Sequence, residues 1–106
     1  MPADPTERSE AHAGKPALVM VLDEPLDLPA LCAHLRRRLV ETDAVQVICD
    51  VRRLTHPSTT TLDALARLQL TARRLGCRLW LHHPHPRLRA LLELAGLSEV
   101  IPSKPP

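Results

Sequence analysis

The stretch VQVICDVRRLTHPSTTTLDAL, residues 45–65, gives the clearest indication of the fold. Residues 45–51 are β-branched and apolar apart from Gln46 and Asp50, which predicts a buried strand. The hydroxyl cluster at residues 58–61 then precedes a helical pattern, and such residues commonly cap the first turn of a helix. A hydroxyl at this position can also carry a phosphate beside the positive end of the helix dipole.

The helix that follows is expected to run from about Thr60 to Leu75 and to end at Gly76, the residue type that most often closes a helix in the left-handed conformation. Its two sides differ clearly in polarity. The core side carries Leu62, Leu65, Leu68, Ala72 and Leu75, and the exposed side carries Asp63, Arg67, Arg73 and Arg74.

The residues before this stretch predict another strand and another helix. Residues 17–22 form a continuous apolar run, which is typical of a strand buried on both faces. Asp27 and Pro29 then open a helix, with Arg36–Arg38 on its polar side. The apolar positions at helical spacing are Leu28, Leu31, Cys32, Leu35 and Leu39.

The residues after Gly76 continue the same alternation. Leu79–Leu81 predicts a third strand, and we expect Trp80 to pack against a helix. A third helix, closed by Gly96 with Leu97 in contact, is indicated by Leu88, Leu91, Leu92 and Ala95. Val100 and Ile101 are expected to add a last short strand. The pattern predicts a small α/β domain with a mostly parallel four- or five-stranded sheet and three or more helices.

Length and composition limit the class of protein. A chain of 106 residues is one domain, which we place at residues 16–101. Residues 1–15 are polar and are interpreted as a disordered leader without signal peptide or anchor, and residues 102–106 as a proline-rich tail. No apolar run approaches the roughly 18 residues that span a bilayer, so direct membrane insertion is not expected. Three widely spaced cysteines favour a reduced, cytoplasmic setting.

The charge pattern argues against nucleic-acid binding. The formal net charge is only +2, and aromatic residues make up 1% of the chain, so stacking platforms are missing. We therefore interpret Arg36–Arg38 and the pair Arg73 and Arg74 as solvated helix faces.

The histidines are the obvious metal candidates in the sequence. His82, His83 and His85 lie close together, but neighbouring strand residues such as His82 and His83 point to opposite faces. No acidic residue between Asp63 and Glu93 completes a ligand set. We expect a solvated histidine loop, with no metal and no cofactor.

The cysteines and glycines give no enzyme signature. Cys49 in a strand and Cys32 on an apolar helix stripe are expected to act as small hydrophobic residues. Cys77 is the cysteine expected to be exposed, but no adjacent histidine activates it. No glycine-rich phosphate loop is present in the sequence. We therefore expect a protein that is not an enzyme.

From Val47 to Ile101 the chain resembles the STAS domain, named for sulfate transporters and anti-sigma factor antagonists. The family pattern is an apolar strand ending in Asp, a short loop, Asp-Ser-Ser/Thr-Gly-Leu, a helix ending in Gly, another strand, and a final helix ending in Gly-Leu. The matching segments are Val47–Asp50, Ser58–Leu62, Leu75–Gly76, Leu79–Leu81 and Leu94–Leu97.

The resemblance assigns roles to the hydroxyl cluster. Thr59 matches the family's phosphorylatable Ser, and Thr60 matches the hydroxyl residue after it. Ser58 replaces the family Asp and Thr61 replaces the family Gly. The resemblance implies an anti-sigma factor antagonist-like module that docks on an anti-sigma factor kinase through residues 58–61 and Asp63, and is released by phosphorylation of Thr59, or failing that of Ser58 or Thr60.

Two other interpretations remain open at this point. The cluster can be a helix cap without regulation, a role worth about 1 kcal/mol relative to alanine. The domain can also be a constitutive STAS adaptor or structural subunit, for example of a lipid-transport complex, which the replacements at Ser58 and Thr61 favour. The sequence defines neither the partner nor the oligomeric state.

Overall fold

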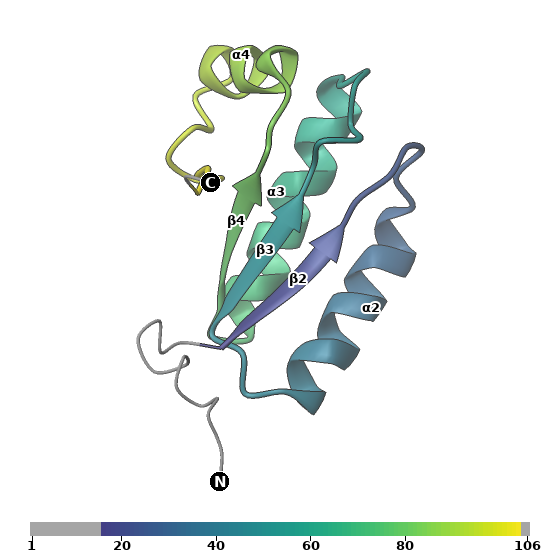
Figure 1. The fold of residues 1–106 in the computed structure, drawn as a ribbon, viewed down its shortest axis with the longest axis vertical. Helices are drawn as coiled ribbons and strands as arrows, with labels where there is room; N and C mark the ends of the chain where they lie inside the picture. Colours follow the sequence, from purple (N-terminus) through teal and green to yellow (C-terminus); the bar gives the residue numbers. More distant parts are fainter. Residues whose placement is uncertain (1–15, 105–106) are drawn as a thin grey trace, which may run out of the picture.

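The computed structural model describes residues 16–104, in which three strands alternate with three helices (Figure 1). In chain order these are β2 (Ala17–Val21), α2 (Leu28–Glu41), β3 (Gln46–Asp50), α3 (Thr59–Arg74), β4 (Arg78–His82) and α4 (Pro86–Leu94). Each coincides with a predicted element, and the α/β class is confirmed. The leader predicted for residues 1–15 lies outside the described residues.

The strands form a parallel sheet in the order β2-β3-β4, so β3 is the central strand. The described residues form three strands, fewer than the four or five predicted. Instead of a strand at Val100 and Ile101, a single bridge joins Leu81 to Ser103. Because Pro102 has no N–H to donate, a longer ladder cannot form there.

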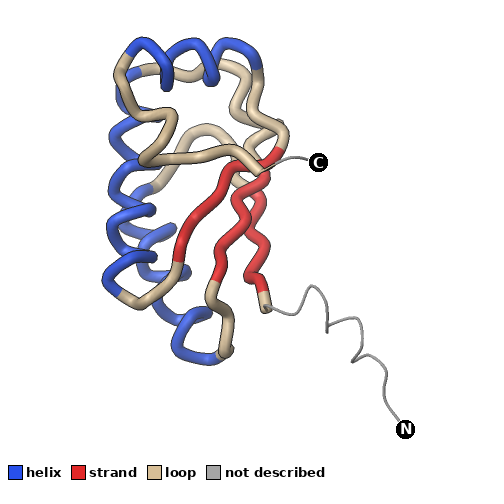
Figure 2. The backbone as a smooth tube through the Cα atoms, turned by 90° about the vertical axis from the view of Figure 1, so that its left-hand side faces the viewer, coloured by secondary structure: helices blue, strands red, loops and turns tan. Residues whose placement is uncertain are grey.

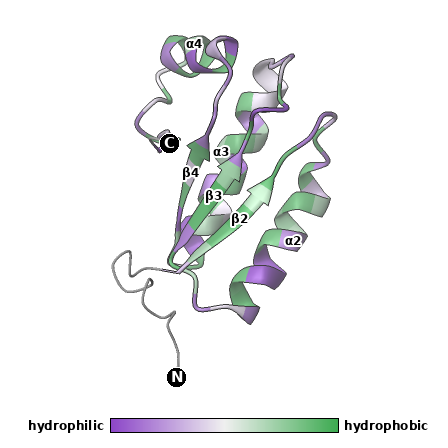
Figure 3. Cartoon of the chain, viewed as in Figure 1, coloured by the Kyte–Doolittle hydropathy of each residue, from purple (hydrophilic) through white to green (hydrophobic). Residues whose placement is uncertain are grey.

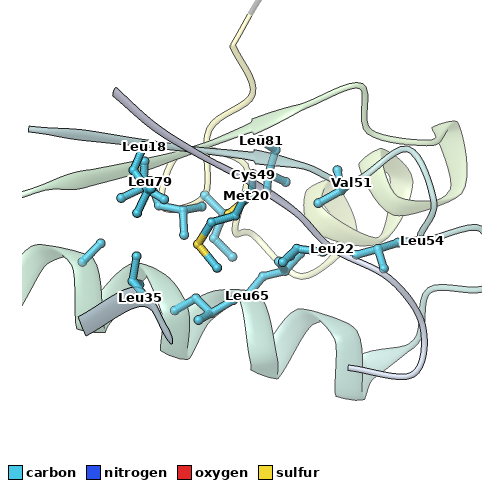
Figure 4. Packing of buried hydrophobic residues seen from close by; sticks show 14 of the residues in the cluster. Leu18, Met20, Leu22, Leu35, Cys49, Val51, Leu54, Leu65, Leu79 and Leu81 are labelled. Atoms are coloured by element: carbon cyan, nitrogen blue, oxygen red, sulfur yellow. The ribbon is translucent and has the colours of Figure 1, made fainter. Parts of the chain in front are cut away.

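The helices α2 and α3 lie on one face of the sheet (Figure 2). The core between these layers is aliphatic, as the composition requires, and Figure 4 shows side chains from sheet and helices meeting in it. Its fully buried members include Leu22, Leu35, Val47, Cys49, Val51, Leu54, Leu65, Leu68, Leu79 and Leu81. In the described part of the chain the fold is therefore a two-layer arrangement.

The other face of the sheet is largely uncovered by the described residues, which corrects two predictions. Val19 is 62% exposed and Val21 is 55% exposed, so β2 is buried on one face and not on both. Figure 3 shows hydrophobic colouring along the strands and mixed colouring on α2. A continuously hydrophobic strand does not by itself reveal whether one face of the sheet is covered or both. Trp80 also lies on this face, where the cations of Arg78 and Lys104 sit 5.1 and 5.0 Å from its ring.

The predicted helix ends are confirmed at both glycines. Gly76 has a φ of +78° and Gly96 a φ of +73°, the left-handed conformation that favours glycine. After Gly76, the Cys77 N–H donates to the Ala72 carbonyl at 2.9 Å. Leu97 packs against the core, the contact expected beside such an end.

A buried glutamine closes the outer edge of β4, and the sequence did not indicate it. Gln69 of α3 is 1% exposed. Its amide oxygen accepts from the Leu79 N–H at 2.9 Å, and its Nε2 donates to the carbonyls of Leu79 and Val100 at 3.0 and 2.8 Å. The side chain therefore serves as a substitute for a neighbouring strand, because it satisfies both backbone groups of Leu79.

Replacing Gln69→Leu should lower the free energy of unfolding by about 1–3 kcal/mol, because the Leu79 N–H and C=O lose their buried partners. Urea denaturation measures the change. Gln46→Leu is the matched control, since Gln46 is half-buried and accepts from the flexible Lys104 ammonium at 2.7 Å, not from a backbone group. A loss of stability at Gln46 equal to that at Gln69 would contradict the role of Gln69 as a substitute for a neighbouring strand.

One of the three cysteines, Cys77, is less accessible to solvent than the sequence predicted. Cys77 is 8% exposed, which corrects the expectation that it is exposed, and its thiol donates to the Ala44 carbonyl at 3.2 Å. Burial raises the pKa of the Cys77 thiol, and burial raises the pKa of Cys49 to about 12. Cys32 is half-buried on α2.

In the folded protein, iodoacetamide at about pH 8 should alkylate Cys32 first, because the thiolate is the reactive form and burial suppresses it at the other two sites. Peptide mass spectrometry over time measures the order of labelling. Cys49 should react only on unfolding, so equal rates at Cys49 and Cys32 would contradict the packing described.

Candidate functional site

The predicted site lies at the carboxyl edge of the sheet. The segments after β2 and β3, residues 22–27 and 51–58, leave the sheet at the same edge because the strands are parallel (Figure 1). The start of α3 lies there as well. In open α/β sheets this edge is where ligands commonly bind.

The loop after β3 is anchored to its own strand. The Arg52 N–H donates to Asp50 Oδ1 at 3.1 Å, and Arg52 Nε lies 3.1 Å from Asp50 Oδ2. Burial acts to raise the pKa of Asp50, but the Arg52 N–H and guanidinium outweigh it and hold that pKa below its usual value. Leu54 is fully buried and fixes the middle of the loop in the core.

The same loop is tied to the loop after β2. Arg53 Nη1 pairs with the Asp23 carboxylate at 3.4 Å. The His56 N–H donates to Glu24 Oε2 at 3.0 Å. These contacts cross from one connection to the other, so the two loops form one structural unit.

The hydroxyl cluster is split into an inward and an outward part. The Ser58 N–H donates to Thr61 Oγ1 at 3.0 Å, one half of a capping box. Thr61 is 8% exposed, so its side chain holds the loop and is largely hidden from a partner. Ser58, Thr59 and Thr60 are exposed.

Asp63 lies one turn further along α3 and also faces outward. Its carboxylate accepts from Arg67 Nε at 3.0 Å, and both side chains are more than half exposed. We call Ser58, Thr59, Thr60 and Asp63 together the helix-start surface. It contains the predicted partner-binding residues except Thr61.

Two cavities flank this surface. The first has a volume of about 500 Å³ and is lined by Glu24, Pro25, Leu26, His56, Ser58, Thr60 and Thr61. The second has a volume of about 350 Å³ and is lined by Pro57, Arg87, Ala90, Leu91 and Leu94. Leu94 is 86% exposed, an unusual value for a large apolar side chain at a helix end. The sequence did not reveal these cavities, because their walls come from loops and helices far apart in the chain.

The histidines do not share one role. His83 has a φ of 60°, and its ring centroid lies 3.9 Å from that of His82, so the expectation that the two point to opposite faces is wrong. The reason is that β4 ends at His82 and the chain turns there. His85 Nδ1 accepts from the Arg87 N–H and caps α4. Within residues 16–104 no three His, Cys, Asp or Glu side chains gather as a metal site.

The arginine clusters lie on exposed helix positions. Arg36–Arg38 are exposed on α2. Arg73 and Arg74 are exposed in the last turn of α3, where the negative end of the helix dipole stabilises cations. None of the helices between residues 16 and 104 is long and apolar enough to cross a membrane.

These features define a small parallel α/β domain whose distinctive surface is a hydroxyl-bearing helix start. A family model described as "Mlab, STAS domain" matches residues 13–102. The chain therefore belongs to the STAS domain family.

The fold is also found in a solved structure. The NMR structure of the protein TM1081 superposes with a TM-score of 0.68 and covers 83% of this chain and 73% of that one. At 9% identity this likeness concerns the fold alone. No curated protein matches the sequence significantly.

Substituting Thr61→Ala should lower the free energy of unfolding by about 1 kcal/mol, because the Ser58 N–H loses its partner at the helix start. Thr59→Ala is the matched control at an exposed position of the same helix, and it should change stability by less than about 0.5 kcal/mol. Thermal and urea unfolding measure both. A larger loss at Thr59 than at Thr61 would contradict the division of the cluster.

Proposed function

We propose that this STAS domain is a non-enzymatic regulatory module that binds a protein partner through the helix-start surface. The partner class is an anti-sigma factor kinase in the cytoplasm, as for an anti-sigma factor antagonist. The observation that carries the proposal is the exposed group Ser58, Thr59 and Thr60, held by two interlocked loops and flanked by two cavities.

The rigidity of this surface supports a binding role. A loop that is already fixed loses little conformational entropy when a partner docks, and more of the contact energy then appears as affinity. Arg53 and His56 reach across to the neighbouring loop, and Leu54 is buried. The exposed Leu94 and the cavity beside it add an apolar contact next to the polar one.

A phosphate on Thr59 is the proposed control. It would add about −1.5 to −2 charges at the first residue of α3, where helix N–H groups tolerate an anion. The unfavourable free energy would arise in the complex with the partner. Like charges opposed across an interface cost several kcal/mol, and about 1.4 kcal/mol is a tenfold change in affinity.

The positions of the hydroxyl groups support Thr59 over its neighbours. Ser58 and Thr60 line the cavity that also contains the Glu24 carboxylate, so a phosphate on either would stand near a like charge. Thr59 does not line that cavity. Thr59 is thus the first candidate, with Ser58 and Thr60 after it.

A constitutive adaptor or structural subunit, for instance of a lipid-transport complex, is the second candidate. One observation favours it: Thr61, in place of the family Gly, fixes the loop through the Ser58 N–H without any phosphate. The matched family model, described as "Mlab, STAS domain", is compatible with either form of the proposal.

Affinity capture from the native cytoplasm with wild type, Thr59→Asp and Thr59→Ala tests the switch. A kinase partner should be retained by wild type and Thr59→Ala and lost with Thr59→Asp, which imitates the phosphate charge. Ala33→Asp, an exposed position on α2, is the control for added charge and should retain the partner. Mass spectrometry of the native protein should find the phosphate on Thr59.

The remaining outcomes distinguish the two candidates. A transport ATPase or permease bound equally by all four proteins, with no phosphate on residues 58–60, supports the adaptor and contradicts the switch. Thr60→Arg adds bulk to the helix-start surface and should abolish either complex. Unchanged binding by folded Thr60→Arg would contradict the proposed surface itself.

A further inference from the structure

The first cavity contains the carboxylate of Glu24, which has no arginine partner within residues 16–104, unlike Asp23 beside it in the chain. Asp23, Asp50 and Asp63 each lie within 3.4 Å of an arginine nitrogen. Glu24 instead lies 3.7 Å from His56 Nδ1, a ring that carries charge only when protonated. Its other oxygen accepts from the His56 N–H at 3.0 Å.

Glu24 is also partly withdrawn from solvent. Its side chain is 29% exposed, which lies between the 16% of Asp50 and the 59% of Asp23 and Asp63. A carboxylate that is partly buried and without a permanent cation interacts more strongly with an incoming charge than a fully solvated one. The wall of this cavity therefore carries a negative charge that an incoming cation can neutralise.

The rest of the lining has a definite chemistry. Pro25 and Leu26 supply apolar surface, and Ser58 and Thr60, which line the same cavity, carry hydroxyl oxygens that can accept hydrogen bonds. A volume of about 500 Å³ is within the roughly 300–1,000 Å³ typical of ligand pockets. Such a lining suits a group with an aliphatic stem and a head rich in hydrogen-bond donors.

We propose that this cavity receives an arginine side chain of the protein partner, with Glu24 as its charged contact. The inference rests on the proposed function, since it names the chemistry recognised beside Thr59. Thr59 itself does not line the cavity, so its phosphate would act against an acidic group of the partner outside the cavity. A guanidinium carries five N–H donors in a rigid fork, so it can bind the Glu24 carboxylate and a hydroxyl oxygen together.

Other occupants fit the lining less well. The start of α3 attracts anions with about half a positive charge, but a phosphate group here would face the full negative charge of Glu24. A purely apolar side chain would cover the carboxylate without giving it a partner, which is costly. The combination of Glu24, Pro25 and Leu26 selects a basic side chain with an apolar stem.

The test uses N-acetyl-L-arginine amide as the probe and the uncharged analogue N-acetyl-L-citrulline amide as its control. NMR of the 15N-labelled full chain should show saturable shifts of the Glu24, Leu26, His56 and Thr60 amides with the arginine probe only. One side chain binds weakly, so saturation is expected in the range of about 1–50 mM.

Glu24→Gln is the decisive variant, because the amide oxygen still accepts from the His56 N–H while the charge is gone. It should abolish the shifts, whereas Glu41→Gln, at an exposed carboxylate of α2 outside the cavity lining and the helix-start surface, should retain them. Equal shifts with citrulline, undiminished shifts in folded Glu24→Gln, or no saturable shifts would overturn the inference. The NMR titration contains no partner protein, so its outcome is independent of the affinity capture. A negative titration would overturn only the arginine site, and a negative capture would overturn only the proposed function.

Discussion

The packing of the central strand against the helical layer that contains α3 fixes the position of every other element. Val47, Cys49 and Val51 are fully buried, as are Leu65 and Leu68 of the helix above them. A helix that returns the chain to a parallel strand must begin at the carboxyl edge of the sheet. The position of the hydroxyl cluster at that edge therefore follows from the packing of β3 and α3.

The order of elements was predictable because burial imposes periods that the sequence shows directly. Alternating strands and helices, Asp27 as a cap and Gly76 as a helix end all follow from local chemistry, and the structure confirms them. The exposed face of β2 was not predictable, since a continuous apolar run looks the same with one face covered or two. Gln69 was missed because its partners, Leu79 and Val100, become neighbours only in the fold.

The candidate site shows the same division between local and long-range information. Family spacing placed Thr59 at the start of α3, where the structure has it exposed. It did not distinguish Thr61, which is turned inward to hold the Ser58 N–H. The cavity at Glu24 was also hidden, because it forms between two connections about 30 residues apart in the chain. The proposed recognition surface combines hydroxyl groups whose position follows from local sequence with a pocket that only the fold creates.

We propose that the partner docks on the carboxyl edge of the sheet and not on its uncovered face. Hydroxyl-radical footprinting of the chain, free and bound to its captured partner, distinguishes these two faces. Leu26 and Leu94, beside the two cavities, should lose reactivity in the complex, while Val19 and Trp80 on the open face should keep theirs. Protection of Val19 and Trp80 with unchanged Leu26 and Leu94 would contradict the claim.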